Sequence, residues 1–427
     1  MQKMENETQE ILKNYIVGLD LGRTYAQISY VSFEGDEGDV YNIPVCLCKR
    51  TGANQWFHGE EAKKAAANFQ GTLVDDLLSL ALKGEPVQIE HASADPVELL
   101  SLFIRNCLAG LGLYNHQVAV KALVISVDTL SERMLEILNH IKKSVLHDFE
   151  HVFFEPKMEC LFSYTIHQPK ELRCYELGVI DLADGYLKFY HIRMNNKTKP
   201  IVTTIDEHED PTFCIPEDFH SIVEKDEYLH MMDEKLAGIM EEFLNNRLVT
   251  VFYLAGKIFE KEWCPQTLKL ICHNRRVFGG SNLYSKGACL LGMERLSPGK
   301  EAQEYLYLGK DKLSADIGVA VMQGGKTVVH NLLNGGEKWF EVKKEFEFMP
   351  GEDGKLPIVI TPLADKRQRI VPVILPTIVN RDIKSLKFRC LLRMKSANEL
   401  VVEVEDAGLG EFFAPTNKRY QEIISLV

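Results

Sequence analysis

Hydrophobic and polar positions alternate in two matched segments that lie far apart in the chain, Val17–Tyr30 and Leu177–Ile192. In each segment an apolar run ends at an aspartate, Asp20 or Asp181, a turn containing glycine follows, and the alternation resumes. This pattern predicts a β-hairpin in each segment. Two such hairpins facing each other could enclose a polyphosphate, because glycine lets backbone N–H groups approach phosphates and the carboxylates can hold a metal through water.

Between and after these hairpins, apolar runs of strand length alternate with amphipathic runs of helix length. A buried strand is predicted at Lys121–Thr129, and a helix at Ser131–Leu146 with Ser131 as its N-cap. The segment His151–Ile166 repeats the pair, with Glu155-Pro156 at the break. A polar, proline-containing stretch is expected at about 195–219, followed by a helix at Tyr228–Asn245, a strand at Val249–Gly256 and a helix at Tyr284–Met293. Alternating strands and helices favour an α/β domain with both sheet faces covered.

The pattern changes near Ser297-Pro298-Gly299. From there short alternating runs are separated by turn residues, and the chain is expected to be almost free of helix until a short amphipathic end at Lys418–Val427. We therefore predict one domain over residues 1–298 and a β-sandwich over residues 299–427.

Composition narrows the classes of function. The 427 residues are 45% hydrophobic, so the chain can bury large cores, and its net charge of −12 without a Lys/Arg-rich tract argues against nucleic-acid binding. The sequence has no long apolar run and no basic, apolar leader, so we expect a cytoplasmic protein that does not bind membranes.

The ten cysteines are scattered and lie mostly in apolar runs, as expected for buried thiols in a reducing compartment. Cys46 and Cys48 would share one face of a strand, and Cys272-His273 is a neighbouring pair, but neither predicts a zinc site.

A set of ordered motifs resembles the DnaK-type heat-shock chaperones of the actin-like ATPase superfamily. The motifs are DLGRTY at Asp20–Tyr25, FHGEEAKKAAANF at Phe57–Phe69, ALVISVDTLSERML at Ala122–Leu135, FFEPKMECLFSYTI at Phe153–Ile166, DLADG at Asp181–Gly185, VFYLAG at Val251–Gly256 and SKGACLLG at Ser285–Gly292. In addition, Val373–Glu411 resembles the family's β-sandwich peptide-binding domain. The resemblance implies an α/β two-lobed actin-like ATPase fold with ribonuclease H-like halves, followed by a C-terminal β-sandwich domain. Lobe I would span about residues 1–166 and lobe II about 167–298.

The resemblance also implies roles for individual residues. Asp20 and Asp181 would be the carboxylates around magnesium, Lys63 would position the attacking water, and Glu155 would be the acid beside it. Contacts to ATP or ADP would come from the two phosphate loops and the adenosine segment: Asp20, Gly22, Arg23, Thr24, Tyr25, Asp184, Gly185 and Gly256. Phosphoryl transfer needs charge neutralisation and an oriented water, which two carboxylates, a lysine and an acid could supply. Without the resemblance, Lys63 reads as a solvated helix-face lysine and Glu155 as a helix N-terminal residue attracted to the dipole.

The chain also departs from the chaperone motifs. Arg23 replaces a small hydroxyl residue, and Lys188 stands where the chaperones place a further acidic residue. The second loop, with Asp184, is closer to the actin version, and Gly256 alone remains of the usual glycine pair. We expect Arg23 to pair with Asp181 or Asp184 and so to weaken ATP binding.

These features lead to two hypotheses. The first is a chaperone-like scaffold with a degenerate nucleotide cleft, which binds a peptide or protein partner through residues 299–427. The second is an active ATPase whose nucleotide state switches the β-domain. A filament-forming, actin-like protein is a third alternative, which the C-terminal β-domain disfavours. The sequence predicts neither the partner nor the oligomeric state.

Overall fold

The computed structural model describes residues 15–33, 38–90, 92–112, 120–173, 175–183, 185–197, 199–215, 225–280, 282–363, 367–378, 382, 385–410, 412–416 and 418–426. The chain divides into two compact units, unit 1 at Met1–Tyr307 and unit 2 at Leu308–Val427. The division falls later than Pro298 because helix α10 (Lys300–Glu304) leads into β16 (Tyr305–Tyr307), which pairs with a strand of unit 1, β13 (Ile201–Cys214).

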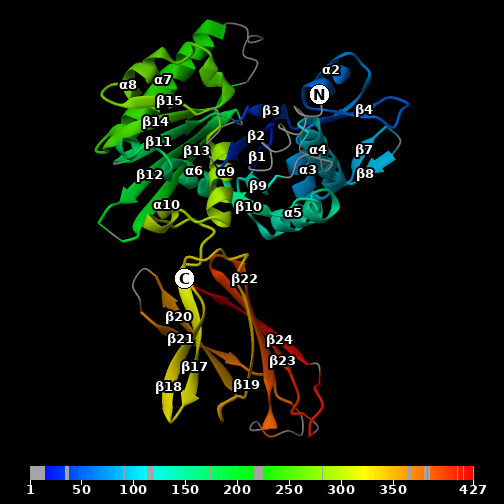
Figure 1. Ribbon diagram of the computed structural model, residues 1–427, viewed down its shortest axis with the longest axis vertical. Helices are drawn as coiled ribbons and strands as arrows, with labels where there is room; N and C mark the ends of the chain where they lie inside the picture. Colours follow the sequence, from blue (N-terminus) through cyan, green and yellow to red (C-terminus); the bar gives the residue numbers. More distant parts are fainter. Residues whose placement is uncertain are drawn as a thin grey trace, which may run out of the picture. The chain divides into compact units, whose positions relative to one another are not determined.

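Unit 1 contains two sheets with the same topology (Figure 1). The first comprises β1 (Tyr15–Leu21), β2 (Tyr25–Ser32), β3 (Tyr41–Pro44), β9 (Ala122–Val127) and β10 (Val152–Pro156), in the order β10-β9-β1-β2-β3. The second comprises β11 (Glu176–Asp181), β12 (Tyr186–Asn195), β13, β14 (Val249–Ala255), β15 (Arg276–Gly279) and β16, in the order β15-β14-β11-β12-β13-β16. In each sheet the first three strands are antiparallel, and two later strands run parallel to the first. Both predicted hairpins, β1–β2 and β11–β12, are confirmed.

Smaller elements flank the first sheet. A three-stranded sheet, in the order β5-β4-β6, contains β4 (Leu47–Arg50), β5 (Trp56–His58) and β6 (Gly71–Val74). The other elements are α2 (Gly59–Ala67), α3 (Leu77–Lys83), β7 (Val87–Ile89), β8 (Ala92–Ala94), α4 (Pro96–Gly110) and α5 (Glu132–Ser144). The predicted cap of α5 is confirmed, because the Ser131 hydroxyl accepts a hydrogen bond from the Met134 N–H at 3.1 Å.

Two helices, α6 (Lys157–Ile166) and α9 (Leu283–Leu296), pack between the two sheets (Figure 1). Leu161 and Tyr284 belong to a core cluster with residues of the second sheet, whereas Cys160 and Ala288 belong to a cluster with residues of the first. The helices also approach each other closely, since a Cβ at Gly287 of α9 would lie 2.0 Å from the Cys160 carbonyl oxygen. The two sheets therefore share one helical layer.

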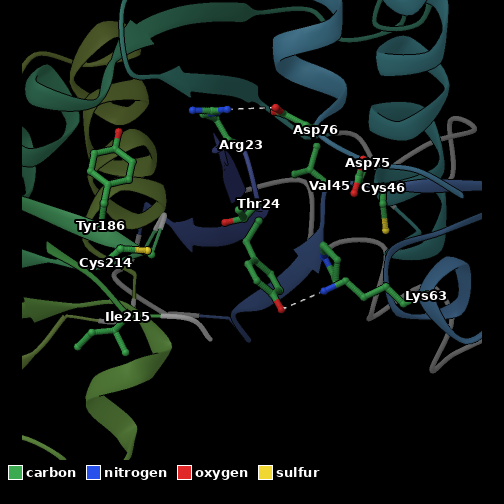
Figure 2. A pocket seen from close by; sticks show the side chains of 13 residues that line it. Arg23, Thr24, Val45, Cys46, Lys63, Asp75, Asp76, Tyr186, Cys214 and Ile215 are labelled. Atoms are coloured by element: carbon green, nitrogen blue, oxygen red, sulfur yellow. Dashed lines mark hydrogen bonds and ion pairs between the residues drawn. The ribbon is translucent and has the colours of Figure 1, made fainter. Parts of the chain in front are cut away.

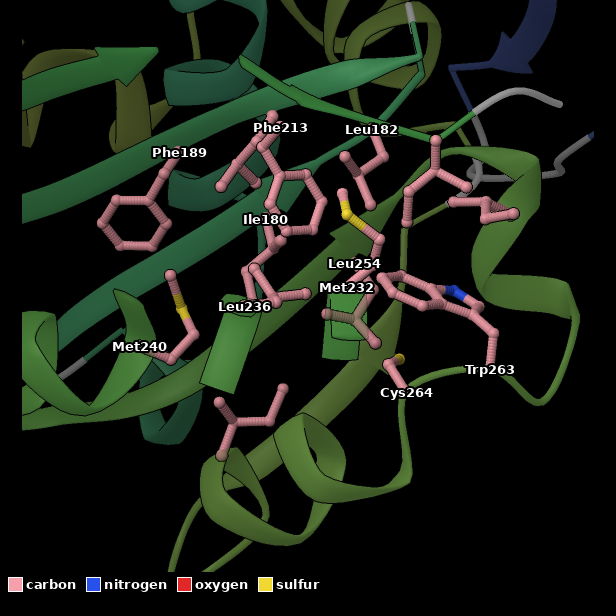
Figure 3. Close-up of a cluster of buried hydrophobic side chains, with 14 of the residues drawn as sticks. Ile180, Leu182, Phe189, Phe213, Met232, Leu236, Met240, Leu254, Trp263 and Cys264 are labelled. Atoms are coloured by element: carbon pink, nitrogen blue, oxygen red, sulfur yellow. The ribbon is translucent and has the colours of Figure 1, made fainter. Parts of the chain in front are cut away.

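The other face of the second sheet is covered by α7 (Lys225–Leu244) and α8 (Pro265–Ile271), and the short 3-10 helices η1 (Lys170–Leu172) and η3 (Lys257–Glu260) complete the elements of unit 1. Figure 3 shows the core beneath α7, in which Met232, Leu236 and Met240 meet side chains of the sheet such as Phe189 and Leu254. This packing anchors β11 and β14, the strands that end at Asp181 and Ala255.

Unit 2 consists of two four-stranded antiparallel sheets. One, in the order β18-β17-β20-β21, contains β17 (Ala315–Gln323), β18 (Lys326–Leu333), β20 (Lys355–Pro362) and β21 (Arg369–Ile374). The other, in the order β19-β22-β23-β24, contains β19 (Lys343–Phe348), β22 (Phe388–Ser396), β23 (Glu399–Asp406) and β24 (Arg419–Ser425). Alternate residues of β22, such as Phe388, Cys390 and Leu392, are buried, which is the pattern of a sheet with one covered face.

The polar stretch at about 195–219, to which the sequence assigned no element, contains the long strand β13, whose polar residues are mostly half-exposed while its backbone pairs with β12. One expectation is wrong: within the C-terminal end predicted to be a short amphipathic segment after the strands, Arg419–Ser425 form strand β24, paired with β23. Among the described residues, no helix combines the length and the apolar character needed to cross a membrane.

The close contact between α6 and α9 gives a test of the shared layer. Gly287→Ala should lower the free energy of unfolding by about 1–3 kcal/mol, because the new methyl group meets backbone atoms rather than a flexible side chain. The matched control is Gly238→Ala in α7, where a Cβ meets nothing within 4 Å. That substitution should raise stability by about 0.5–1 kcal/mol through helix propensity. Urea unfolding of both variants measures the difference, and equal effects would contradict the close packing.

Candidate functional site

The central strands of the two sheets end at equivalent acidic positions. Asp20 lies near the end of β1, beside Ser126 of β9 in the register, and Asp181 ends β11, beside Lys188 of β12. Both aspartates are buried, with exposed fractions of 8% and 5%. The structure therefore places the two aspartates of the hairpin pattern where the sequence predicts them, at the turn end of each hairpin.

Two buried lysines neutralise this acidic region. The Lys157 ammonium lies 2.9 Å from Asp128 Oδ1 and 3.8 Å from Asp20 Oδ2, and the Lys188 ammonium lies 3.1 Å from Asp128 Oδ2. Burial alone would raise the pKa of Asp128, but the charges of the two lysines outweigh it and hold that pKa well below its usual range. Asp128 therefore stays ionised at neutral pH and bridges both ammonium groups.

The carboxylates assigned to magnesium already have other partners. Asp20 Oδ1 accepts a hydrogen bond from the Ser126 hydroxyl at 3.1 Å. Asp181 Oδ1 accepts from the Ala183 N–H at 2.8 Å, and Asp181 Oδ2 accepts from the Tyr284 hydroxyl at 2.5 Å. The described residues contain no group of three or more acidic, histidine or cysteine side chains that could hold a metal. In this arrangement a lysine ammonium approaches Asp20, where the resemblance implies a divalent cation.

The turn N–H groups expected to bind phosphate also donate elsewhere. Gly22 N–H donates to the Tyr25 carbonyl at 3.0 Å and Gly185 N–H to the Leu182 carbonyl at 3.1 Å. The two turns approach each other, because the Thr24 hydroxyl donates to the Ala183 carbonyl at 3.5 Å. The cavity that remains between the turns and the adenosine segment has a volume of about 70 Å³. Small-molecule sites usually enclose about 300–1,000 Å³.

Gly256 closes this space from the second sheet. Its φ is +113°, and a Cβ there would lie 2.9 Å from the backbone carbon of Leu182, so glycine is required for the strand end to approach the second turn. Beside it, the Lys257 ammonium lies 4.2 Å from the centre of the Tyr25 ring. Gly256 and Lys257 therefore contact the hairpin turns directly. Asp184 lies outside the described residues.

A larger cavity of about 710 Å³ is lined by residues of both turns, among them Thr24, Tyr25, Gly185 and Tyr186 (Figure 2). Its wall includes Arg23, whose guanidinium forms a 3.1 Å ion pair with Asp76. The predicted partner Asp184 lies outside the described residues, so the predicted pairing stays a prediction. Because the Arg23 and Asp76 side chains are 52% and 41% exposed, their pair contributes at most about 1 kcal/mol, well below the value expected for a buried pair. Burial raises the pKa of the Cys46 thiol in the same wall to about 11, so this thiol is protonated at neutral pH.

The two remaining catalytic candidates lie in different places. Lys63 of α2 lines the larger cavity, and its ammonium donates to the Tyr25 hydroxyl at 3.5 Å (Figure 2). Glu155 at the end of β10 is fully buried and forms a 2.7 Å ion pair with Arg295 of α9, outside the set of residues lining either cavity. The structure therefore brings Lys63 toward the first loop and gives Glu155 a partner in the helical layer.

Four residues of this region were not identified from sequence: Asp76, Asp128, Lys157 and Tyr284. Lys157 and Asp128 each directly follow a buried strand, and this position in the sequence could have identified them as site residues. Parallel neighbouring strands place such residues at the same sheet edge, so the ends of β9 and β10 could have been paired.

Comparison of the sequence with known families gives two matches. The family described as "Family of unknown function (DUF5716) C-terminal" matches residues 29–310, and the domain described as "Domain of unknown function (DUF8552)" matches residues 312–426. No curated protein matches the sequence. Because the first match covers more than half of the chain, the protein belongs to the family described as "Family of unknown function (DUF5716) C-terminal".

Proposed function

We propose that this protein is a divergent, DnaK-like member of the actin-like superfamily that acts as a binding scaffold. In this proposal unit 1 holds a degenerate nucleotide cleft, and unit 2 binds an extended peptide or a protein segment. The repeated topology of the two sheets supports an actin-like arrangement of unit 1, since each sheet has three antiparallel strands followed by two parallel ones. The free cysteines among the described residues support a cytoplasmic location.

The observation that carries the proposal is the small space left beside Asp20 and Gly256, although a larger cavity is lined by both turns. A triphosphate would need turn N–H groups, a metal and an opening between the two sheets. Here the turn N–H groups of Gly22 and Gly185 donate within their own hairpins, and the remaining cavity is about 70 Å³. Lys157 adds a cation next to Asp20. These features favour a scaffold over an ATPase.

The edge strand β21 of unit 2 supports the peptide-binding part of the proposal. Ile370, Pro372 and Ile374 occupy alternate positions and so face one side of the strand, where Ile370 and Ile374 are 60% and 65% exposed. Strand β20 contributes Pro357, opposite Pro372, to the same side. We define these four residues as the β21 strip. An exposed apolar strip on an edge strand suits an extended peptide with apolar residues at alternate positions.

A second candidate function, ATP hydrolysis, is favoured by the larger cavity. Its volume of about 710 Å³ is within the range of small-molecule sites, and Arg23, Thr24 and Lys63 line it. A nucleotide with its phosphates in this cavity would meet two cations. ATP binding is therefore the measurement that separates the two functions.

Calorimetric titration of the full chain with ATP and magnesium should show no saturable heat, corresponding to a dissociation constant weaker than about 1 mM. Arg23→Thr should leave this result unchanged, because Arg23 lines the larger cavity and not the small one between the turns. Saturable, stoichiometric ATP binding by the wild-type protein would instead support the ATPase.

Peptide binding should depend on the β21 strip. Fluorescence anisotropy of labelled heptapeptides with alternating apolar residues should show binding to the full chain. Ile374→Lys should weaken this binding by about tenfold or more, since a charge replaces an apolar side chain of the strip. Met322→Lys is the matched control, because Met322 is 72% exposed on β17, outside the strip. Equal losses in the two variants, or no binding by the wild-type protein, would argue against this function.

A further inference from the structure

Lys157 and Lys188 are unusual because both are charged and almost fully enclosed. Their side chains are 6% and 7% exposed. Lysine is almost never buried without a paired charge, and here both ammonium groups contact the single carboxylate of Asp128. Lys188 also lies 4.0 Å from Glu209 of β13. The arrangement is a chain of alternating charges rather than an isolated pair.

The chain of charges lies where the acidic ends of β1 and β11 converge. Lys157 approaches Asp20 at 3.8 Å, and its ammonium also lies 5.3 Å from the centre of the Tyr284 ring. The hydroxyl of that same tyrosine donates to Asp181. One ammonium group therefore contacts both Asp20 and the residue that binds Asp181.

The charges also join the two sheets of unit 1. Asp128 follows β9 and Lys157 begins α6 directly after β10, so both belong to the first sheet's edge. Lys188 lies on β12 of the second sheet, opposite Asp181 in the register. The ion pair between Lys188 and Asp128 is thus a direct link between the sheets.

We propose that Lys157 and Lys188 are a built-in replacement for the divalent cation that the DnaK resemblance implies between the two hairpins. They neutralise Asp20 and Asp128 and link the two sheets of unit 1. The inference rests on the proposed actin-like arrangement of unit 1 and is independent of peptide binding by unit 2. It accounts for the carboxylates of Asp20 and Asp128, which lie next to protein cations.

The test uses Mn²⁺ alone as the probe, with the full chain. Bound Mn²⁺ is measured by the loss of the free-ion electron paramagnetic resonance signal, and stability by thermal unfolding, with NaCl at equal ionic strength to correct for screening. Wild-type protein should bind no Mn²⁺ between the hairpins, and its melting temperature should not respond to the ion. Lys157→Gln, which removes the charge but keeps most of the side chain, should melt at a lower temperature, bind a single Mn²⁺ and regain several degrees when it does.

Two further variants are the matched controls. Lys157→Arg keeps the positive charge and should neither bind nor respond to Mn²⁺. Adding Asp20→Asn to Lys157→Gln should abolish the Mn²⁺ response, which locates the ion at this carboxylate. A role of Lys157 in packing alone would lower the melting temperature without any recovery in Mn²⁺.

Three outcomes would overturn the proposal. They are a wild-type Mn²⁺ site that Asp20→Asn removes, a folded Lys157→Gln protein that ignores Mn²⁺, and a Lys157→Gln protein that fails to fold both with and without the ion. None of these outcomes bears on peptide binding, and the experiment contains no nucleotide. A failure of the lysine proposal is therefore distinguishable from a failure of the proposed scaffold function.

Discussion

The shared carboxylate of Asp128 is the interaction on which the arrangement of unit 1 depends. Lys157 begins α6 directly after β10 of the first sheet, and Lys188 lies on β12 of the second sheet. Both are buried, so each requires an opposite charge nearby. Removing one partner of a buried ion pair typically costs about 3–5 kcal/mol, and the 41% exposure of the Asp128 side chain moves the expected cost toward the lower end. Apolar side chains of similar volume would often make the folded protein at least as stable as these buried charges do. This is a reason to look for a functional role of the charges in linking the sheets.

The same region shows which contacts hold the two sheets close to each other. The helical layer of α6 and α9 packs against both sheets, and Gly287 lets its two helices approach to backbone contact. At the open end of this layer the hairpin turns meet through Thr24 and the Ala183 carbonyl, and Gly256 packs against the second turn. Apolar packing and the neighbouring ion pairs thus act together in holding the sheets. The small cavity between the turns follows from both.

Much of this fold could be predicted from local patterns, whereas the site could not. Each hairpin is specified by an apolar run, an aspartate and a glycine turn, so β1–β2 and β11–β12 were predictable. Strand β13 was missed because its polar residues carry little apolar alternation, and its backbone is fixed by pairing with β12. Lys188 was recognisable as a departure, but its partner was not, since Asp128 lies on another sheet and only the fold brings the two together. The ion pair between Arg23 and Asp76 could not be predicted for the same reason.

The central claim, that a lysine replaces a metal ion between the hairpins, is tested most directly by crystallography. Crystals of the wild-type protein grown with Mn²⁺ and ATP would be measured at the manganese absorption edge, so that the anomalous signal locates the ion. The account predicts the Lys157 ammonium within ion-pair distance of Asp128 and Asp20 and no anomalous peak between the two hairpin turns. A manganese peak coordinated by Asp20 and Asp181, with Lys157 displaced, would contradict it.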